Sequence, residues 1–271
     1  MTKYFIGALI ALWAVPYCLL NAASQSPDEA QEHIQHWFEQ IAVATDDKTK
    51  LAFNDSIDAC LTEVLTQEDS FYFPFDSLQY LGKIMSSDRL VRIYTWNISL
   101  SYGFLFNGFV QRQSGEIYRL TQTEHAFLPD SLQQIAANQW YGALYYRAVA
   151  HKYEGETVYL LAGWSRYRAF TQVKILDVIR FDGEGNLYLG LPIFRDEDTF
   201  LSRICFEYDA LTTFHLDYNA SKKRFEADHL SPIRFDGKEI LTFGADMSVD
   251  AFVRKGKYWI KKDDIKVKNV R

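Results

Sequence analysis

The sequence predicts a mainly β protein that carries helices at its N-terminus. Three observations support this: apolar residues recur at helical spacing only before residue 80, many short runs of β-forming residues follow, and the breaks between those runs are short. Short breaks favour antiparallel hairpins over parallel crossovers. We expect an antiparallel meander, closed as a barrel or folded as a sandwich. An irregular propeller-like β body is the alternative, although no blade-length motif repeats.

The first 22 residues have the layout of a secretory signal peptide. Lys3 provides a positive start, residues 4–20 carry no charge, and the small residues Ala22 and Ala23 follow. The apolar part is short for a membrane span, and Pro16 interrupts it. We therefore expect cleavage near residue 22, export to the periplasm, the cell surface or the extracellular space, and no membrane span after cleavage. A retained N-terminal anchor is the alternative.

Residues 23–79 predict an acidic helical cap. Ser26, Pro27 and Glu29 are typical of a helix start, because serine caps the first turn and the glutamate lies three positions further on. A second helix is expected over residues 47–65. Apolar side chains recur at helical spacing in both helices, at Ile34, Trp37, Phe38, Ile41, Phe53, Ile57, Leu61 and Val64. We expect these apolar sides to pack against the β body.

Residues 80–271 predict the antiparallel β body with a basic C-terminal tail. The expected strands are residues 80–85, 90–96, 104–112, 117–121, 141–150, 157–164, 171–181, 186–190, 203–209, 213–218, 224–229, 250–253 and 258–260. Residues 129–135 are expected to form a short helix or a loop. The tail over residues 254–271 is rich in lysine and arginine, and the helical cap is rich in Asp and Glu. We expect the tail to contact the acidic helices; an external anionic ligand is the alternative.

The sharpest group of polar residues lies on three successive runs between residues 203 and 229. Each run alternates apolar and polar side chains, as strands with one buried face do. Pairing the runs in chain order with their apolar faces aligned places Glu207, His215 and Glu226 in a row on the other face. Such a row could act in acid–base chemistry or hold a divalent metal. A solvated sheet face with favourable charge pairs is the alternative.

No further feature indicates a reaction. Gly-x-Ser-x-Gly, His-Glu-x-x-His and CxxC motifs do not occur. We therefore assign no catalytic residue, no metal ligand and no cofactor. His229 falls on the apolar side of its run, which predicts a buried, hydrogen-bonded histidine. Cys60 and Cys205 remain after removal of the leader, and they either form one bridge or stay as free thiols.

Three segments resemble those of a family of uncharacterised exported bacterial proteins. They are Val-Lys-Ile-Leu-Asp-Val-Ile-Arg-Phe at residues 173–181, Ile-Cys-Phe-Glu-Tyr-Asp at residues 204–209, and Phe-Glu-Ala-Asp-His-Leu-Ser-Pro at residues 225–232. The resemblance extends over residues 80–260. It implies a bacterial, exported protein, and it implies no activity and no functional residues, because the family has no assigned activity.

These observations predict an exported envelope or periplasmic protein that is not an enzyme and binds a ligand or a protein partner through its β body. Glu207, His215 and Glu226 are the candidate binding residues. The partner is an unknown ligand or another envelope protein, and no nucleic-acid partner is expected. A hydrolase or metal-dependent enzyme that uses the same strand face is one alternative. A structural or assembly factor whose acidic helices bind an envelope protein is another.

Overall fold

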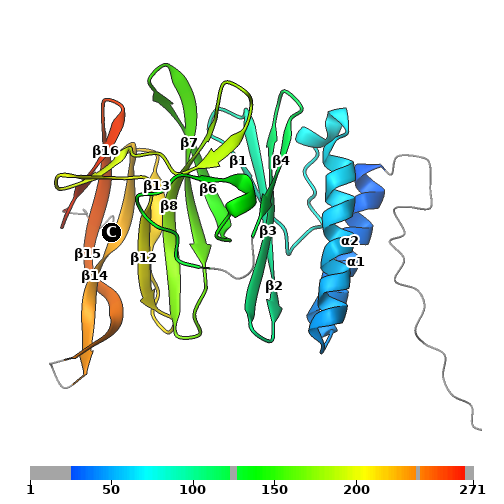
Figure 1. Cartoon of the computed structure of the whole chain (residues 1–271), viewed down its shortest axis with the longest axis horizontal. Coiled ribbons are helices and arrows are strands. Elements are labelled where there is room, and N and C mark those ends of the chain that lie inside the picture. Colours follow the sequence, from blue (N-terminus) through cyan, green and yellow to red (C-terminus); the bar gives the residue numbers. More distant parts are fainter. Residues whose placement is uncertain (1–25, 123–126, 236–238, 266–271) are drawn as a thin grey trace, which may run out of the picture.

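A computed structural model describes residues 26–122, 127–235 and 239–265. Its elements form four layers, in which two helices, a first sheet, a central sheet and an outer sheet follow one another (Figure 1). The fold class expected from the sequence is confirmed: the chain is mainly β, with N-terminal helices and antiparallel sheets. The sheets stack as a sandwich, and none of the described sheets closes into a barrel. The expected signal peptide lies outside the described residues.

Each of the two helices begins at a local capping signal. Helix α1 (Pro27–Val43) starts with the expected capping box: the Ser26 hydroxyl accepts a hydrogen bond from the Glu29 amide, and the Glu29 side chain accepts one from the Ser26 amide. Helix α2 (Asp47–Leu65) is capped by Asp46, which accepts a bond from the Thr49 amide. A short 3₁₀ turn, η2 (Glu68–Phe71), follows. Among the described residues, no helix has the length and apolar character of a membrane span.

The first sheet is a simple meander. Its strands lie in chain order and are β1 (Gly82–Met85), β2 (Val91–Leu100), β3 (Gly103–Arg112) and β4 (Ile117–Thr121). The central sheet has the order β5 (Ile135–Ala136), β9 (Leu187–Leu189), β8 (Thr171–Phe181), β7 (Glu156–Ser165) and β6 (Leu144–Tyr153). β12 (Ile204–Asp209) also pairs with β8. The expected short helix or loop before residue 135 is a loop, and a 3₁₀ turn, η3 (Ala137–Gln139), follows β5.

The outer sheet contains strands that the sequence did not predict. Its order is β11 (Thr199–Leu201), β10 (Phe194–Asp196), β16 (Tyr258–Lys262), β15 (Glu239–Lys255), β14 (Arg224–Phe235) and β13 (Leu216–Asn219). Its pairs are antiparallel except β10 with β16, which run parallel. β14 and β15 are much longer than the expected strands over residues 224–229 and 250–253.

Three cores separate the four layers. The helices bury one face of the first sheet, including Tyr94, Trp96 and Phe109. The other face of that sheet packs on the central sheet. The far face of the central sheet packs on the outer sheet through residues such as Phe206 and Phe225. The helices and the outer sheet therefore lie at opposite ends of the molecule (Figure 1).

The expected contact between the acidic helices and the basic tail is wrong for the described part of the tail. Lys257 pairs with Glu154 of the β6–β7 turn, and Lys261 lies within 4 Å of carboxylates of the outer sheet and of the segment that follows β16. Two intervening sheets separate these lysines from the helices (Figure 1). Lys257 and Lys261 are therefore neutralised by carboxylates close to them. No disulfide joins Cys60 to Cys205, and burial raises the pKa of Cys205 to about 12.

A buried polar contact ties α2 to the first sheet. The side-chain oxygen of Asn54 accepts hydrogen bonds from Trp96 Nε1 at 2.9 Å and from Asn107 Nδ2 at 3.0 Å. Asn54 and Trp96 are buried. We expect Asn54→Ala to lower the free energy of unfolding by about 1–3 kcal/mol, because it leaves these donors without their acceptor. Urea unfolding measures the change. Asp55→Ala, on the exposed side of the helix, is the control and should stay within about 0.5 kcal/mol of the wild type.

Candidate functional site

The structure does not bring Glu207, His215 and Glu226 together. The expected pairing of β12 with β13 is wrong, since β12 pairs with β8 in the central sheet and β13 pairs with β14 in the outer sheet. The apolar faces of β12 and β13 instead meet across the core between the two sheets, where the rings of Phe206 and Phe214 lie 5.1 Å apart. Their polar faces therefore point away from each other, and Glu207 is separated from the other two residues by that core.

Glu207 lies on the inner side of the central sheet and is satisfied there. It is half-buried and accepts a hydrogen bond from Thr171 Oγ1 at 2.7 Å. Arg168 Nη1 lies 3.7 Å from the same carboxylate. These partners come from β8 and from the turn that precedes it, so Glu207 holds that turn against β12.

His215 and Glu226 lie on the outer face of the outer sheet, in a register two residues away from the expected one. Asp217, and not His215, is opposite Glu226. A shift of two residues keeps each side chain on its predicted face, so the buried face was predicted correctly. Burial opposes ionisation of Glu226, but hydrogen bonds from Asn219 and Arg224 outweigh it and lower the pKa of the carboxyl. His215 is exposed. Glu226 is therefore a half-buried carboxylate that pairs with Lys222 and Arg224, and it forms no joint site with the exposed His215.

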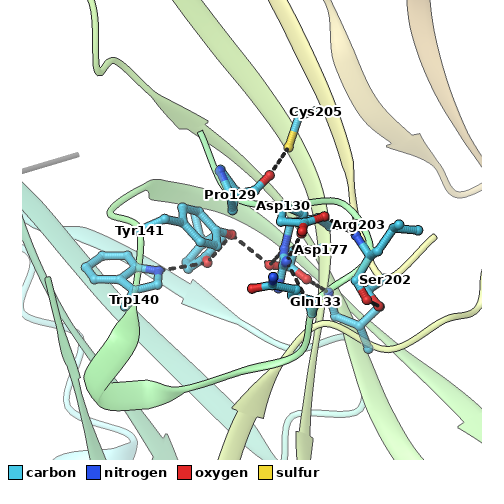
Figure 2. A network of polar contacts seen from close by, with 12 residues as sticks. Pro129, Asp130, Gln133, Trp140, Tyr141, Asp177, Ser202, Arg203 and Cys205 are labelled. Atoms are coloured by element: carbon cyan, nitrogen blue, oxygen red, sulfur yellow. Dashed lines mark hydrogen bonds and ion pairs between the residues drawn. The ribbon is translucent and has the colours of Figure 1, made fainter. Parts of the chain in front are cut away.

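A buried polar network in the central sheet has a structural role (Figure 2). Arg203 Nε donates to Asp177 Oδ2 at 3.0 Å, and both side chains are fully buried. Arg203 Nη1 also donates to the carbonyls of Asp130 and Gln133. The Tyr141 hydroxyl donates to Asp177 at 2.9 Å, and burial together with that carboxylate raises the pKa of the phenol well above its usual value. The network fastens the loop before β5 to β8 and β12, and its central ion pair is closed to solvent.

The candidate functional site lies on the outer sheet, where β14, β15 and the segment that follows β16 bring three polar residues together. Asp250 of β15 is buried, and both of its carboxylate oxygens lie 3.1 Å from His229 Nδ1 of β14. Asp263, which follows β16, completes a group whose nitrogen and oxygen atoms lie within 4.8 Å of one another. The expectation for His229 is confirmed for the hydrogen bond but not for the burial, since 35% of its side chain is exposed.

Lys261 supplies the positive charge of this site. Its ammonium lies 2.9 Å from Asp263, 3.7 Å from Asp250 and 3.8 Å from Asp196 of β10. Burial favours the neutral amine, but the hydrogen bond to Asp263 and the charges of the three carboxylates outweigh it and raise the pKa of Lys261. With a neutral His229, three carboxylates around one ammonium leave a formal net charge of −2. We call His229, Asp196, Asp250, Lys261 and Asp263 the acidic cluster.

A long hairpin arm leaves the sheet beside this cluster. We define the arm as residues 230–235 of β14 and 239–248 of β15. The pairing of the two strands shifts between Asp228 and Leu230, where His229 faces several residues of β15, and Met247 there has a φ of 74°. The hairpin then extends beyond the neighbouring strands, at the lower left of Figure 1. The acidic cluster therefore lies at the base of the arm.

The arm exposes apolar side chains. Ile240, Leu241 and Met247 have exposed fractions of 50%, 64% and 99%, and Ile233 and Phe243 are also exposed. In the part of the chain that the structure describes, the arm strands pair only with each other, because β13 pairs with β14 no further than Ala227 and β16 pairs with β15 no further than Ala251. Both outer edges of the arm thus present backbone N–H and C=O groups that no strand takes up.

Neither the acidic cluster nor the arm was predicted from the sequence. The signal for the arm is the Asp236-Gly237 dipeptide between two runs of β-forming residues, a strong short-range sign of a hairpin. The cluster has no comparable signal, because its members are far apart in the chain. No protein-family model matches the chain, and no curated protein matches its sequence.

Proposed function

We propose that the chain is an exported protein without enzymatic activity that captures an extended segment of another polypeptide on the β14–β15 arm. The observation that carries this proposal is the combination of exposed apolar side chains and unpaired strand edges on a two-stranded ribbon that leaves the body of the protein. An isolated two-stranded ribbon is marginally stable in water. A further strand on either edge would pair the open backbone groups and cover apolar surface at the same time.

The chemistry of the arm favours a polypeptide strand over other partners. Arg234 and Glu239 are the charged residues among its tip-proximal described positions, and they lie in neighbouring cross-strand pairs. The arm therefore has little net charge there to attract an anionic polymer or a nucleic acid. Its main recognition elements are backbone groups and apolar side chains, which complement an extended segment that alternates apolar and polar residues.

A peptide titration tests this proposal. We expect a short peptide of alternating valine and threonine to shift the backbone NMR signals of the arm residues in the full chain. The same peptide with a central proline should not, since proline lacks the N–H group that strand pairing requires. Phe243→Asp should weaken binding by about tenfold or more, the effect typical of a central contact residue. Phe170→Asp is the matched control, because Phe170 is 83% exposed and lies outside the arm.

Three outcomes would overturn the proposal. Equal binding of both peptides, or no binding of either, would mean that the arm does not pair with an extended strand. Concentration-dependent dimerisation in sedimentation experiments, abolished by Phe243→Asp and not by Phe170→Asp, would mean that the arm is covered by a second copy of the chain. Thermal unfolding of both variants tests whether they remain folded.

A further inference from the structure

We propose that His229, Asp250 and Asp263 form a binding site for one divalent transition-metal ion, a property that goes beyond partner capture by the arm. The three residues come from β14, β15 and the segment after β16. Each residue offers one potential ligand atom, an imidazole nitrogen or a carboxylate oxygen, and these three atoms lie within 4.8 Å of one another. A single ion at this point would join three segments at the base of the arm.

The distances suit coordination. Bonds of about 2.1 Å to zinc place neighbouring ligand atoms about 3.0–3.4 Å apart. His229 Nδ1 lies 3.1 Å from each of the two carboxylate oxygens of Asp250. The Asp263 carboxylate must move closer to His229 and Asp250 to bind the same ion. Its side chain can rotate to do so, because 62% of it is exposed. The Asp264 amide donates to Asp250 Oδ1 at 3.2 Å, which orients this carboxylate as outer hydrogen bonds do in metal sites.

The charge of the acidic cluster also favours a divalent cation. With neutral His229, the formal net charge of −2 around Lys261 matches the charge of one such ion. Lys261 is the competitor, since its ammonium lies between Asp250 and Asp263. When a metal ion displaces the Lys261 ammonium from Asp250 and Asp263, Asp196, 3.8 Å from that ammonium, remains as its partner. Metal binding therefore exchanges one cation for another at Asp250 and Asp263, and Lys261 limits the affinity.

The ligand set points to a particular class of ion. Imidazole with carboxylates suits zinc, manganese and related transition metals, whereas calcium and magnesium prefer sites built from oxygen alone. The described part of the site offers no thiolate, the ligand that selects Cu(I). We therefore use Zn²⁺ as the probe, Co²⁺ as its spectroscopic substitute, and Mg²⁺ and Ca²⁺ for comparison.

Calorimetric titration of the metal-free full chain with Zn²⁺ tests the site. We expect one ion per chain, with affinity reduced about tenfold or more by His229→Gln and by Asp263→Asn. Asp263 is exposed, so Asp263→Asn should leave the fold intact. Lys261→Met should increase the affinity about tenfold or more, because it removes the competing cation. Co²⁺ should give visible absorption bands that change with His229→Gln. Mg²⁺ and Ca²⁺ should bind at least about tenfold more weakly than Zn²⁺.

His215→Gln is the matched control, since His215 is an exposed histidine that directly precedes β13 and lies outside the acidic cluster. It should leave the affinity unchanged. The proposal fails if neither the wild type nor Lys261→Met binds Zn²⁺, or if His229→Gln and Asp263→Asn bind it as the wild type does. Loss of binding by His215→Gln alone would assign the ion to a surface histidine and would also overturn it. None of these results depends on the peptide titration, so the two proposals fail separately.

Discussion

Asp177→Asn is expected to lower the free energy of unfolding by about 3–5 kcal/mol, the usual cost of removing one partner of a buried ion pair. The substitution keeps the shape of the side chain and removes its charge. It leaves the guanidinium of Arg203 fully buried without a counterion, because the other partners of Arg203 are the carbonyls of Asp130 and Gln133. The loop before β5 should loosen as a result, because Arg203 holds that loop through these carbonyls (Figure 2).

Chemical denaturation followed by tryptophan fluorescence measures this effect. Asp217→Asn is the matched control: Asp217 also pairs with an arginine, Arg147 at 2.7 Å, but the two side chains are 31% and 44% exposed. A pair in solvent contributes little, so the control should cost less than about 1 kcal/mol. Similar losses of unfolding free energy for the two variants would show that Asp177 does not stabilise the protein by compensating the buried charge of Arg203. Adding Arg203→Met to Asp177→Asn should cost less than Arg203→Met alone, since partners in one network are not additive.

The start of α1 and the bounds of α2 could be predicted because their signals are local. The capping box at Ser26 and Glu29 is satisfied within one helical turn, and the apolar stripe that includes Ile34 is buried in the core that the two helices share with the first sheet. The antiparallel β body could also be predicted, because short turns permit little else. The alternation of apolar residues even identified the buried faces of β12 and β13.

The neighbours of those strands could not be predicted. Alternation shows which face is buried, but it does not distinguish a strand beside another from a strand opposite it across a core. The rings of Phe206 and Phe214 could approach each other on adjacent strands or across a core, and in the structure they meet across the core between the central and outer sheets. The proposed row of Glu207, His215 and Glu226 required β12 and β13 to be adjacent strands of one sheet. They lie in different sheets, so the row does not form.

The acidic cluster could not be predicted from the sequence either, because it also depends on how the strands pair. Asp250 falls on the buried side of β15, opposite Ala227, where a carboxylate is not expected from the pattern. Its partners reach it only because the β14–β15 pairing shifts at His229 and because β16 returns along β15. Irregularities of this kind depend on the whole sheet, so no short segment of the sequence encodes them.

Deleting residues 27–66 is expected to unfold the β body or make it aggregate. These residues supply both helices and cover one face of the first sheet. Their loss would expose five side chains of that face that are buried in the structure, namely Tyr94, Trp96, Ile98, Leu100 and Phe109. Burial of large apolar side chains contributes about 1.5–3 kcal/mol each, so the sum for this face is comparable to the entire stability of a typical domain, about 5–15 kcal/mol.

The deletion therefore distinguishes a detachable helical cap from one that completes the core. Size-exclusion chromatography, circular dichroism and thermal unfolding of the shortened chain provide the measurement. Glu32→Lys with Glu39→Lys is the control, because both residues lie on the exposed side of α1 and their replacement alters the charge of the helices without uncovering the sheet. A shortened chain that stays monomeric and unfolds cooperatively would show that the sheets are stable alone, and the acidic helices would then be free to serve as a partner-binding module. Aggregation of the shortened chain beside a well-folded control would instead assign the helices to the core and leave the arm, at the other end of the molecule, as the surface for a partner.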